Sequence, residues 1–120
     1  MQLKVITKDG ITPLKDLRIG TNVLCEDGKS YPVRNIAVVA HRGYYIKISS
    51  AFGFHIHSRF KIKTENGFKF PEVYDIIPID KDFTPSVIAT VESTDVKFYY
   101  DIHIDGNMIS PEGIVFKFSE

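Results

Sequence analysis

Apolar and polar residues alternate with a period of two along almost the whole chain, between short clusters of turn-forming residues. This pattern is typical of strands that are buried on one face, and no segment has the spacing of a long helix. The pattern therefore predicts an all-β, antiparallel and mostly closed domain of about ten short strands. The expected strands are Leu3–Thr7, Asn22–Cys25, Tyr31–Ala40, Tyr44–Ile48, Phe54–His57, Phe60–Thr64, Phe68–Phe70, Val87–Glu92, Val96–Ile104 and Gly113–Phe118.

Short glycine-containing clusters are expected to reverse the chain between these strands. Asp27-Gly28 and Asn66-Gly67 are strong hairpin signals, and the second predicts a type I′ turn because both residues tolerate a positive φ. His41-Arg42-Gly43 is likewise expected to form a turn, which makes a hairpin of the two strands on either side of it.

Composition and charge exclude several classes of protein. The chain has 120 residues, with 15 Lys+Arg and 15 Asp+Glu, and we expect one domain over residues 1–120. The zero net charge argues against a nucleic-acid partner, and no apolar run approaches the roughly 20 residues of a membrane helix. The N-terminus has no secretion signal, so we expect an intracellular or virion-associated location. Cys25 is the sole cysteine and cannot form an internal disulfide.

Three blocks of sequence, in order along the chain, carry a resemblance to a known family. Lys4–Val23 contains a strand, an Asp-Gly turn and a Gly-Thr-Asn-Val step, and Phe54–Phe68 contains two histidines followed by a strand and a glycine turn. Tyr100–Val115 contains a Tyr-Asp strand and then a Gly-Ile-Val strand. Together they resemble the hedgehog/intein (Hint) family. The resemblance implies a compact, pseudo-twofold Hint-like β domain that covers nearly the whole chain.

The same resemblance implies a self-processing chemistry whose residues are largely absent. Hint domains use an opening Cys or Ser nucleophile, a Thr-x-x-His block and, in inteins, a terminal His-Asn pair. Here no Cys or Ser precedes Val5, Phe54 falls on the threonine, and Phe116–Phe118 falls on the terminal pair. His57 falls on the block histidine and becomes a vestigial candidate. We therefore expect a chain that is not an enzyme, with no upstream segment to be cleaved.

The expected function is a non-catalytic structural or protein-interaction module, an accessory protein of a virus or phage, which works with protein partners or in a larger assembly. Two alternatives stay open. One is a self-processing domain, by autoproteolysis or acyl transfer, with residual activity at His57 and Cys25. The other is an unrelated small β-barrel binding domain.

Histidines and the lone cysteine offer weaker chemistry. His55 and His57 are two residues apart in an expected strand and share a face, and His103 lies on another strand, so these three are weak metal candidates. Exposed polar histidines are the commoner explanation, so we expect no metal and no cofactor. Cys25 ends an apolar strand and is expected to be a small buried hydrophobe.

Aromatic residues are dense and often adjacent, and neighbours in a strand point to opposite faces. Some must therefore lie off the core, where aromatic rings supply contact area for a protein partner. We expect Tyr45, Tyr99, Phe116 and Phe118 to serve this role. Phe116–Phe118 is the first place to look, because we expect it to be an unpaired strand edge.

Overall fold

The computed structural model describes residues 2–48, 53–57, 59–79 and 84–118. In this part of the chain the structure has twelve strands, one short 3-10 helix and no α-helix. The elements are β1 (Lys4–Thr7), β2 (Gly10–Pro13), η1 (Leu14–Asp16), β3 (Asn22–Leu24), β4 (Ser30–Pro32), β5 (Asn35–Ile48), β6 (Gly53–His57), β7 (Phe60–Thr64), β8 (Gly67–Lys69), β9 (Ile76–Ile79), β10 (Thr84–His103), β11 (Met108–Ile109) and β12 (Val115–Phe118). The prediction of an all-β domain is confirmed.

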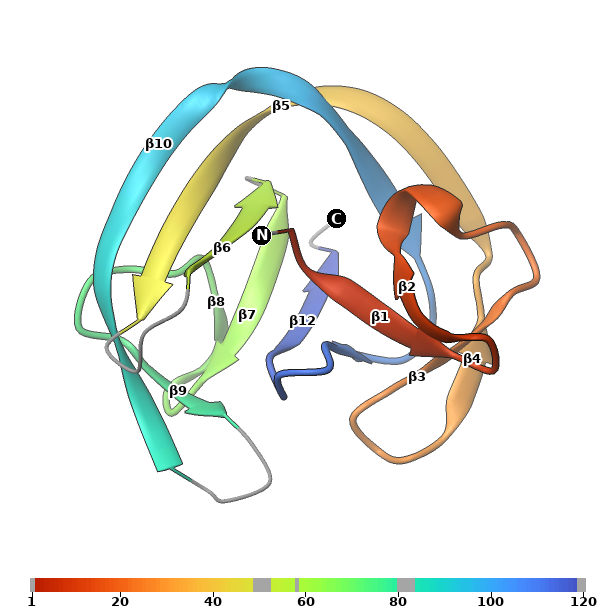
Figure 1. Ribbon diagram of the computed structural model, residues 1–120, viewed down its shortest axis with the longest axis horizontal. Helices are drawn as coiled ribbons and strands as arrows, with labels where there is room; N and C mark the ends of the chain where they lie inside the picture. The colour runs from red at the N-terminus through yellow and green to blue at the C-terminus, as the bar shows by residue number, and fades with distance from the viewer. Residues whose placement is uncertain (1, 49–52, 58, 80–83, 119–120) are drawn as a thin grey trace.

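Two long strands, β5 and β10, organise the molecule. They have 14 and 20 residues and pair antiparallel from Ile48–Ile88 at one end to Asn35–His103 at the other. In Figure 1 this pair arches over the rest of the chain. With β6 and β9 it forms a four-stranded sheet in the order β6-β5-β10-β9, and a second sheet has the order β11-β12-β7-β8.

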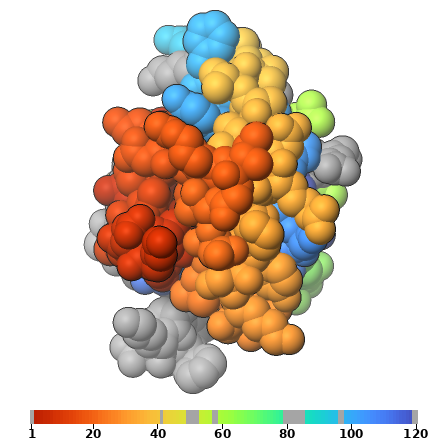
Figure 2. Space-filling view, turned by 90° about the vertical axis from the view of Figure 1, so that its right-hand side faces the viewer, coloured from red at the N-terminus to blue at the C-terminus, as the bar shows by residue number. Residues whose placement is uncertain are grey.

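Two small hairpins, β1-β2 and β3-β4, complete the fold. Figure 2 shows their red and orange residues covering one face of the molecule together with the first part of β5. Strands β1 and β3 are in contact, so these hairpins pack on each other. None of the described segments forms a helix of the length and apolarity that crossing a membrane requires.

The expected hairpin at residues 41–43 is wrong, because β5 runs straight through it. Gly43 is needed for close packing and not for a turn. A Cβ atom there would collide with the hydroxyl of Tyr99 and approach Oγ1 of Thr94 to 2.8 Å. The glycine therefore lets a tyrosine ring from β10 cross the backbone of β5.

The two expected late strands, Val87–Glu92 and Val96–Ile104, are also one strand, β10. The interruption that separates them in the sequence is an irregularity in the pairing with β5, between Ser93 and Val96. A bulge of this kind bends a strand without ending it, and it lets one long strand serve both ends of the arch.

A single apolar core lies between the sheets and hairpins. Among its residues, Phe60 and Phe116 pack edge to face, with ring centroids 5.5 Å apart. The buried core residues are Leu3, Val5, Leu17, Val23, Val33, Ile46, Ile48, Phe54, Ile56, Phe60, Ile62, Ile77, Ile88, Ile102, Met108, Ile114 and Phe116.

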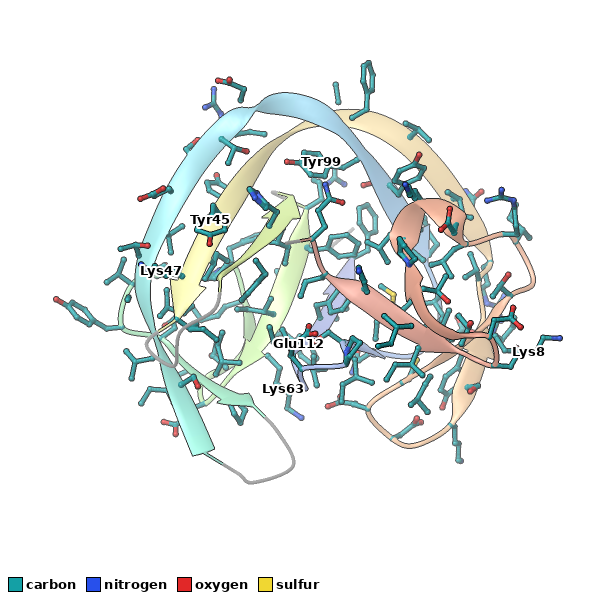
Figure 3. All side chains as sticks on the ribbon, viewed as in Figure 1. Lys8, Tyr45, Lys47, Lys63, Tyr99 and Glu112 are labelled. Carbon is teal, nitrogen blue, oxygen red and sulfur yellow. The ribbon has the colours of Figure 1, made fainter. Side chains whose placement is uncertain are left out.

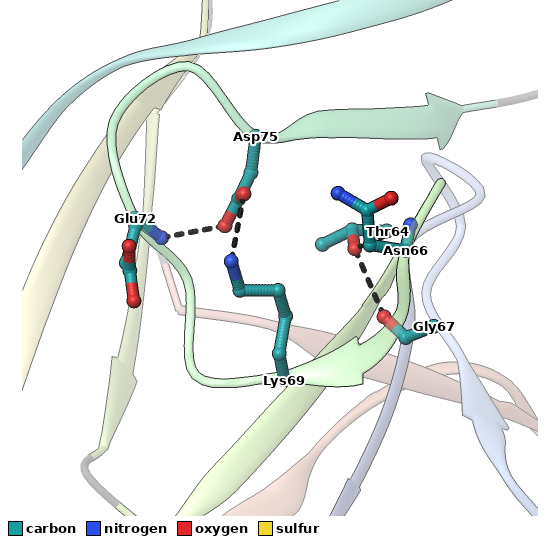
Figure 4. Close-up of polar contacts among 6 residues, drawn as sticks. All are labelled: Thr64, Asn66, Gly67, Lys69, Glu72 and Asp75. Atoms are coloured by element: carbon teal, nitrogen blue, oxygen red, sulfur yellow. Dashed lines mark hydrogen bonds and ion pairs between the residues drawn. The ribbon is translucent and has the colours of Figure 1, made fainter.

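Two turns in different halves of the chain are built alike. At β1-β2, Thr7 accepts a hydrogen bond from the backbone N–H of Asp9 at 3.2 Å and donates to the carbonyl of Gly10 at 3.5 Å. At β7-β8, Thr64 accepts from the N–H of Asn66 at 3.1 Å and donates to the carbonyl of Gly67 at 2.9 Å (Figure 4). This repeated construction supports the expected pseudo-twofold character of the domain.

The turn at Asn66-Gly67 is not of type I′, as the sequence had predicted. Type I′ needs a positive φ at both central residues. Gly67 has a φ of 93°, but the φ of Asn66 is not positive, since Tyr74 is the one non-glycine residue with a positive φ in the described part of the chain. The side-chain hydrogen bonds of Thr64 hold the alternative turn.

The loop between β8 and β9 is held by an ion pair inside it (Figure 4). Asp75 accepts from the Lys69 ammonium at 2.9 Å and from the backbone N–H of Glu72 at 2.8 Å, and its side chain is 9% exposed. The pKa of Lys69 is raised, chiefly by its hydrogen bond to Asp75. This pairing fixes a loop that carries Tyr74, 82% exposed, with a φ of 75°.

A polar cluster joins the turn after β3 to the rest of the domain. Glu26 accepts hydrogen bonds from the Lys63 ammonium and from the Asn107 amide, both at 2.8 Å. The hydrogen bond from Lys63 is the main cause of a lowered pKa for Glu26. One carboxylate thus connects three segments that are far apart in the sequence.

Candidate functional site

The N-terminal segment lies beside β6, at the edge of the first sheet (Figure 1). Gln2 forms a parallel bridge with His55 of that strand. Next to this bridge is a surface pocket of about 180 Å³, which we call the terminal pocket because Gln2 and Phe116 of the last strand both line it. Its lining residues are Gln2, Leu3, Leu14, Lys15, His55, Ile56, Phe60, Phe98, Tyr99, Tyr100 and Phe116.

The deep part of the terminal pocket is apolar and its polar groups are few. Phe60 and Phe116 are 2% and 0% exposed and belong to the core. Phe98 is 75% exposed. The groups able to donate or accept protons or hydrogen bonds are the Gln2 amide, the Lys15 ammonium, the His55 imidazole and two tyrosine hydroxyls. Among the described residues that line the pocket, none carries a carboxylate.

Tyr45 and Tyr99 are held by packing against glycines. Tyr45 lies over Gly53, where a Cβ atom would collide with its ring, and its ring centroid is 4.8 Å from that of His55. Tyr99 crosses Gly43 and is 7% exposed. Figure 3 shows Tyr99 beneath the arch of β5 and β10, with Tyr45 farther along β5. Tyr45 orients His55 from the neighbouring strand, and Tyr99 forms a wall of the pocket.

The other two expected interaction residues lie mostly inside the domain. Strand β12 pairs with β7 on one side and, at Val115 and Phe116, with β11 on the other, so the expectation of an unpaired edge is wrong for Phe116. At Lys117 and Phe118 the pairing is with β7 on one side, and β11 does not reach them. Phe116 is fully buried, while the ring of Phe118 lies 4.7 Å from that of His103. No observation tests whether Tyr45, Tyr99, Phe116 or Phe118 contacts a partner, and this role stays a prediction.

The three metal candidates do not lie together as far as the structure describes them. His55 lines the terminal pocket, whereas His103 lines a separate polar hollow with Asp105, Asn107 and Lys117. His57 ends β6, but its side chain lies outside the described residues. Within the described residues, no group of three or more His, Cys, Asp or Glu side chains is placed to hold a metal ion.

Cys25 lies away from the terminal pocket. It is 2% exposed, and its thiol lies 3.6 Å from the carbonyl oxygen of Val23. Burial, together with the charges of Asp27 and Glu26, raises the pKa of the thiol from 9.0 to about 11. The thiolate is the reactive form, so the structure gives this cysteine little reactivity at neutral pH.

This environment predicts how Cys25 responds to pH and to thiol reagents. At about pH 8 the native protein should react slowly with Ellman's reagent and quickly once unfolded in urea. Because the folded pKa of about 11 exceeds the unfolded value of 9.0, the contribution to stability is full below 9.0 and is lost as pH rises toward 11. Urea titrations of wild type and Cys25→Ala across this range measure it. Equal losses of stability in both proteins would contradict the assignment.

Sequence comparisons find no relative: no protein-family profile matches the chain, and no curated protein matches it. Solved structures do match. The gp41-1 intein has a TM-score of 0.79 at 18% identity, covering 95% of this chain and 93% of its own. The Msm DnaB1 intein splicing domain bound with zinc has 0.76 at 16%, covering 98% and 97%. A DnaB intein from Synechocystis sp. PCC 6803 has 0.72 at 16%, covering 98% and 94%.

These matches define the chain first as a Hint-like domain, since the shared fold covers nearly its whole length. More particularly, its fold is that of inteins. The resemblance drawn from the three sequence blocks is therefore confirmed for the fold. The alternative of an unrelated small β-barrel is wrong.

The expectation that the chain is not an enzyme is corrected by the same comparison. The solved structures that share its fold are inteins, which are self-splicing enzymes, and one of them is titled a splicing domain. The expectation rested on mismatches to short motifs, at Phe54 and at Phe116–Phe118. Mismatches to short motifs at this level of identity do not show that the catalytic groups are missing.

Proposed function

We propose that the chain is a Hint-fold protein-interaction module that binds an extended segment of a protein partner at the terminal pocket. The observation that carries this proposal is an apolar pocket open to the surface, bordered by Phe98, which is 75% exposed. The pocket has a volume of about 180 Å³. Cavities of about 150 Å³ hold a benzene-sized group, so one aromatic or branched aliphatic side chain fits.

The free energy of such binding comes mainly from apolar surface. Burying a large apolar side chain is worth about 1.5–3 kcal/mol, and the ring of Phe98, 75% exposed, offers apolar surface that a bound segment can cover. The polar groups around the pocket, among them the Gln2 amide, can hydrogen-bond a peptide backbone. The location, and a setting in a virus or phage, stay predictions from the sequence.

A peptide-display selection tests this function. A random library of short peptides is selected on the immobilised domain, and the affinities of enriched peptides are measured by fluorescence anisotropy. We expect a shared apolar residue among the enriched peptides, and a loss of affinity of about tenfold in Phe98→Ala. Tyr74→Ala removes an equally exposed ring from a distant loop and should leave affinity unchanged. Peptides that bind Phe98→Ala as well as wild type, or no enrichment at all, would overturn the proposal.

A second candidate function is self-processing, favoured by the intein fold. The His55 imidazole lies where the N-terminal segment meets β6, and imidazole is the side chain most often used to move protons at neutral pH. The resemblance had placed this role at His57, two residues along the same strand.

Intact-mass measurement tests this candidate. The domain is placed between two reporter domains and incubated with and without thiol. A defined fragment or a spliced product that disappears in His55→Ala would support processing at His55, and one that disappears in His57→Ala would move the role to His57. An unchanged mass under all conditions would exclude self-processing.

A further inference from the structure

We infer that the segment bound at the terminal pocket carries a carboxylate next to its apolar side chain. This inference rests on the proposed binding function and specifies the chemistry of the partner. It follows from the charges around the pocket. Lys15 contributes a positive charge, His55 contributes an imidazole, and the lining residues that the structure describes include neither Asp nor Glu.

Lys15 is held at this place by the structure of η1. Leu14 packs against the core beside it, and the N–H of Leu17 donates to the Leu14 carbonyl at 3.2 Å, which closes the short turn. Successive residues in a 3-10 helix point about 120° apart, so Asp16 takes a different direction and does not line the pocket. Lys15 therefore lines the pocket, and no carboxylate lies beside it among the lining residues that the structure describes.

The ammonium of Lys15 is also without an ion-pair partner among the described residues. Three other cations of the domain are neutralised internally, by Arg34–Asp105, Lys63–Glu26 and Lys69–Asp75 pairs. Asp16 and Arg18, on the same turn, do not line the pocket and carry opposite charges, so Lys15 is the charge that the turn brings to the lining. A carboxylate on a bound segment would meet this local positive potential, and charge complementarity of this kind selects between partners.

Three pools of fluorescent peptides test the inference on the intact domain. Each has a central Phe or Leu, with flanking positions drawn only from Asp and Glu, only from Asn and Gln, or only from Lys and Arg. We expect the acidic pool to bind about tenfold more tightly than the amide pool at low salt. The advantage should shrink as NaCl rises from about 50 to about 500 mM, because salt screens exposed charges.

Charge reversal provides the matched variants. Lys15→Glu should abolish or reverse the preference for the acidic pool. Lys8→Glu makes the same change at the exposed β1-β2 turn, which Figure 3 shows at the far end of β1, and should leave the preference unchanged. Both sites are exposed, so neither variant should impair folding.

The outcomes distinguish the preference for a carboxylate from the proposed binding of a segment at the terminal pocket. If acidic and amide pools bind equally, if the basic pool binds best, or if Lys15→Glu changes nothing, the inference is overturned. The binding function still stands in those cases provided that Phe98→Ala weakens every pool. If Phe98→Ala weakens none of them, the binding function and the inference fail together.

Discussion

Replacing Phe116 with alanine is expected to lower the free energy of unfolding by about 3–5 kcal/mol. The side chain is fully buried, and its ring packs edge to face on Phe60 with centroids 5.5 Å apart. Truncation removes this contact and leaves a cavity beneath the terminal pocket, which the surrounding strands can fill only in part. Urea unfolding followed by circular dichroism measures the loss.

Phe98→Ala is the control for this experiment. It makes the same change of residue on β10, at a ring that is 75% exposed, and should alter stability by no more than about 0.5 kcal/mol. A loss below about 1 kcal/mol for Phe116→Ala would contradict the buried position of this ring. The pair of variants also separates the two uses of aromatics in this domain, since one should affect folding and the other binding.

The strands and hairpins that depend only on neighbouring residues could be predicted from the sequence. Alternation predicted most of the strands, and glycine turns predicted the hairpins at Gly28 and Gly67. Alternation missed the short strands β2, β9 and β11, and it joined β4 to β5 in one expected strand, Tyr31–Ala40. The long strands β5 and β10 could not be found in this way, because Gly43 and the segment between Ser93 and Val96 look like turns to any local rule. The reason for Gly43 is the ring of Tyr99, which lies more than fifty positions away along the chain.

The candidate site was less predictable than the fold. Its lining comes from six segments of the chain, which meet only in the folded domain. Adjacent aromatics in a strand must face opposite ways, and this holds for Phe98, which is exposed, and Tyr99, which is buried. The sequence could not say which of the two faces outward. The expected interaction set therefore contained Tyr99 and omitted Phe98.

The two proposed functions of this domain, binding and self-processing, both lie at the terminal pocket. Inteins share its arrangement of strands at 18% identity or less in the matches described above. In this chain aromatic rings and His55 line the terminal pocket, so the two proposed functions, binding and processing, fall on neighbouring groups of one site. Substitutions at Phe98 and His55 distinguish them.

Replacing Gly106 with alanine should destabilise the domain by about 1–3 kcal/mol, because the site is already filled. A Cβ atom there would lie 2.6 Å from Sγ of Cys25 and 2.6 Å from Cδ2 of Tyr31. Cys25 is held in place by a backbone bridge to Met108, and by the hydrogen bond from its N–H to the carbonyl of Lys29 at 2.9 Å. Moving the sulfur away from the new Cβ atom would therefore require a shift of this backbone, which costs stability.

A double-mutant cycle shows which contact carries this cost. Cys25→Ala removes the sulfur, so the double variant should be more stable than the sum of the two single effects by at least about 0.5 kcal/mol. Combining Gly106→Ala with the distant Phe98→Ala should instead give additive changes in the free energy of unfolding. Additivity with Cys25→Ala would mean that the ring of Tyr31, which is only half-buried, gives way in place of the sulfur.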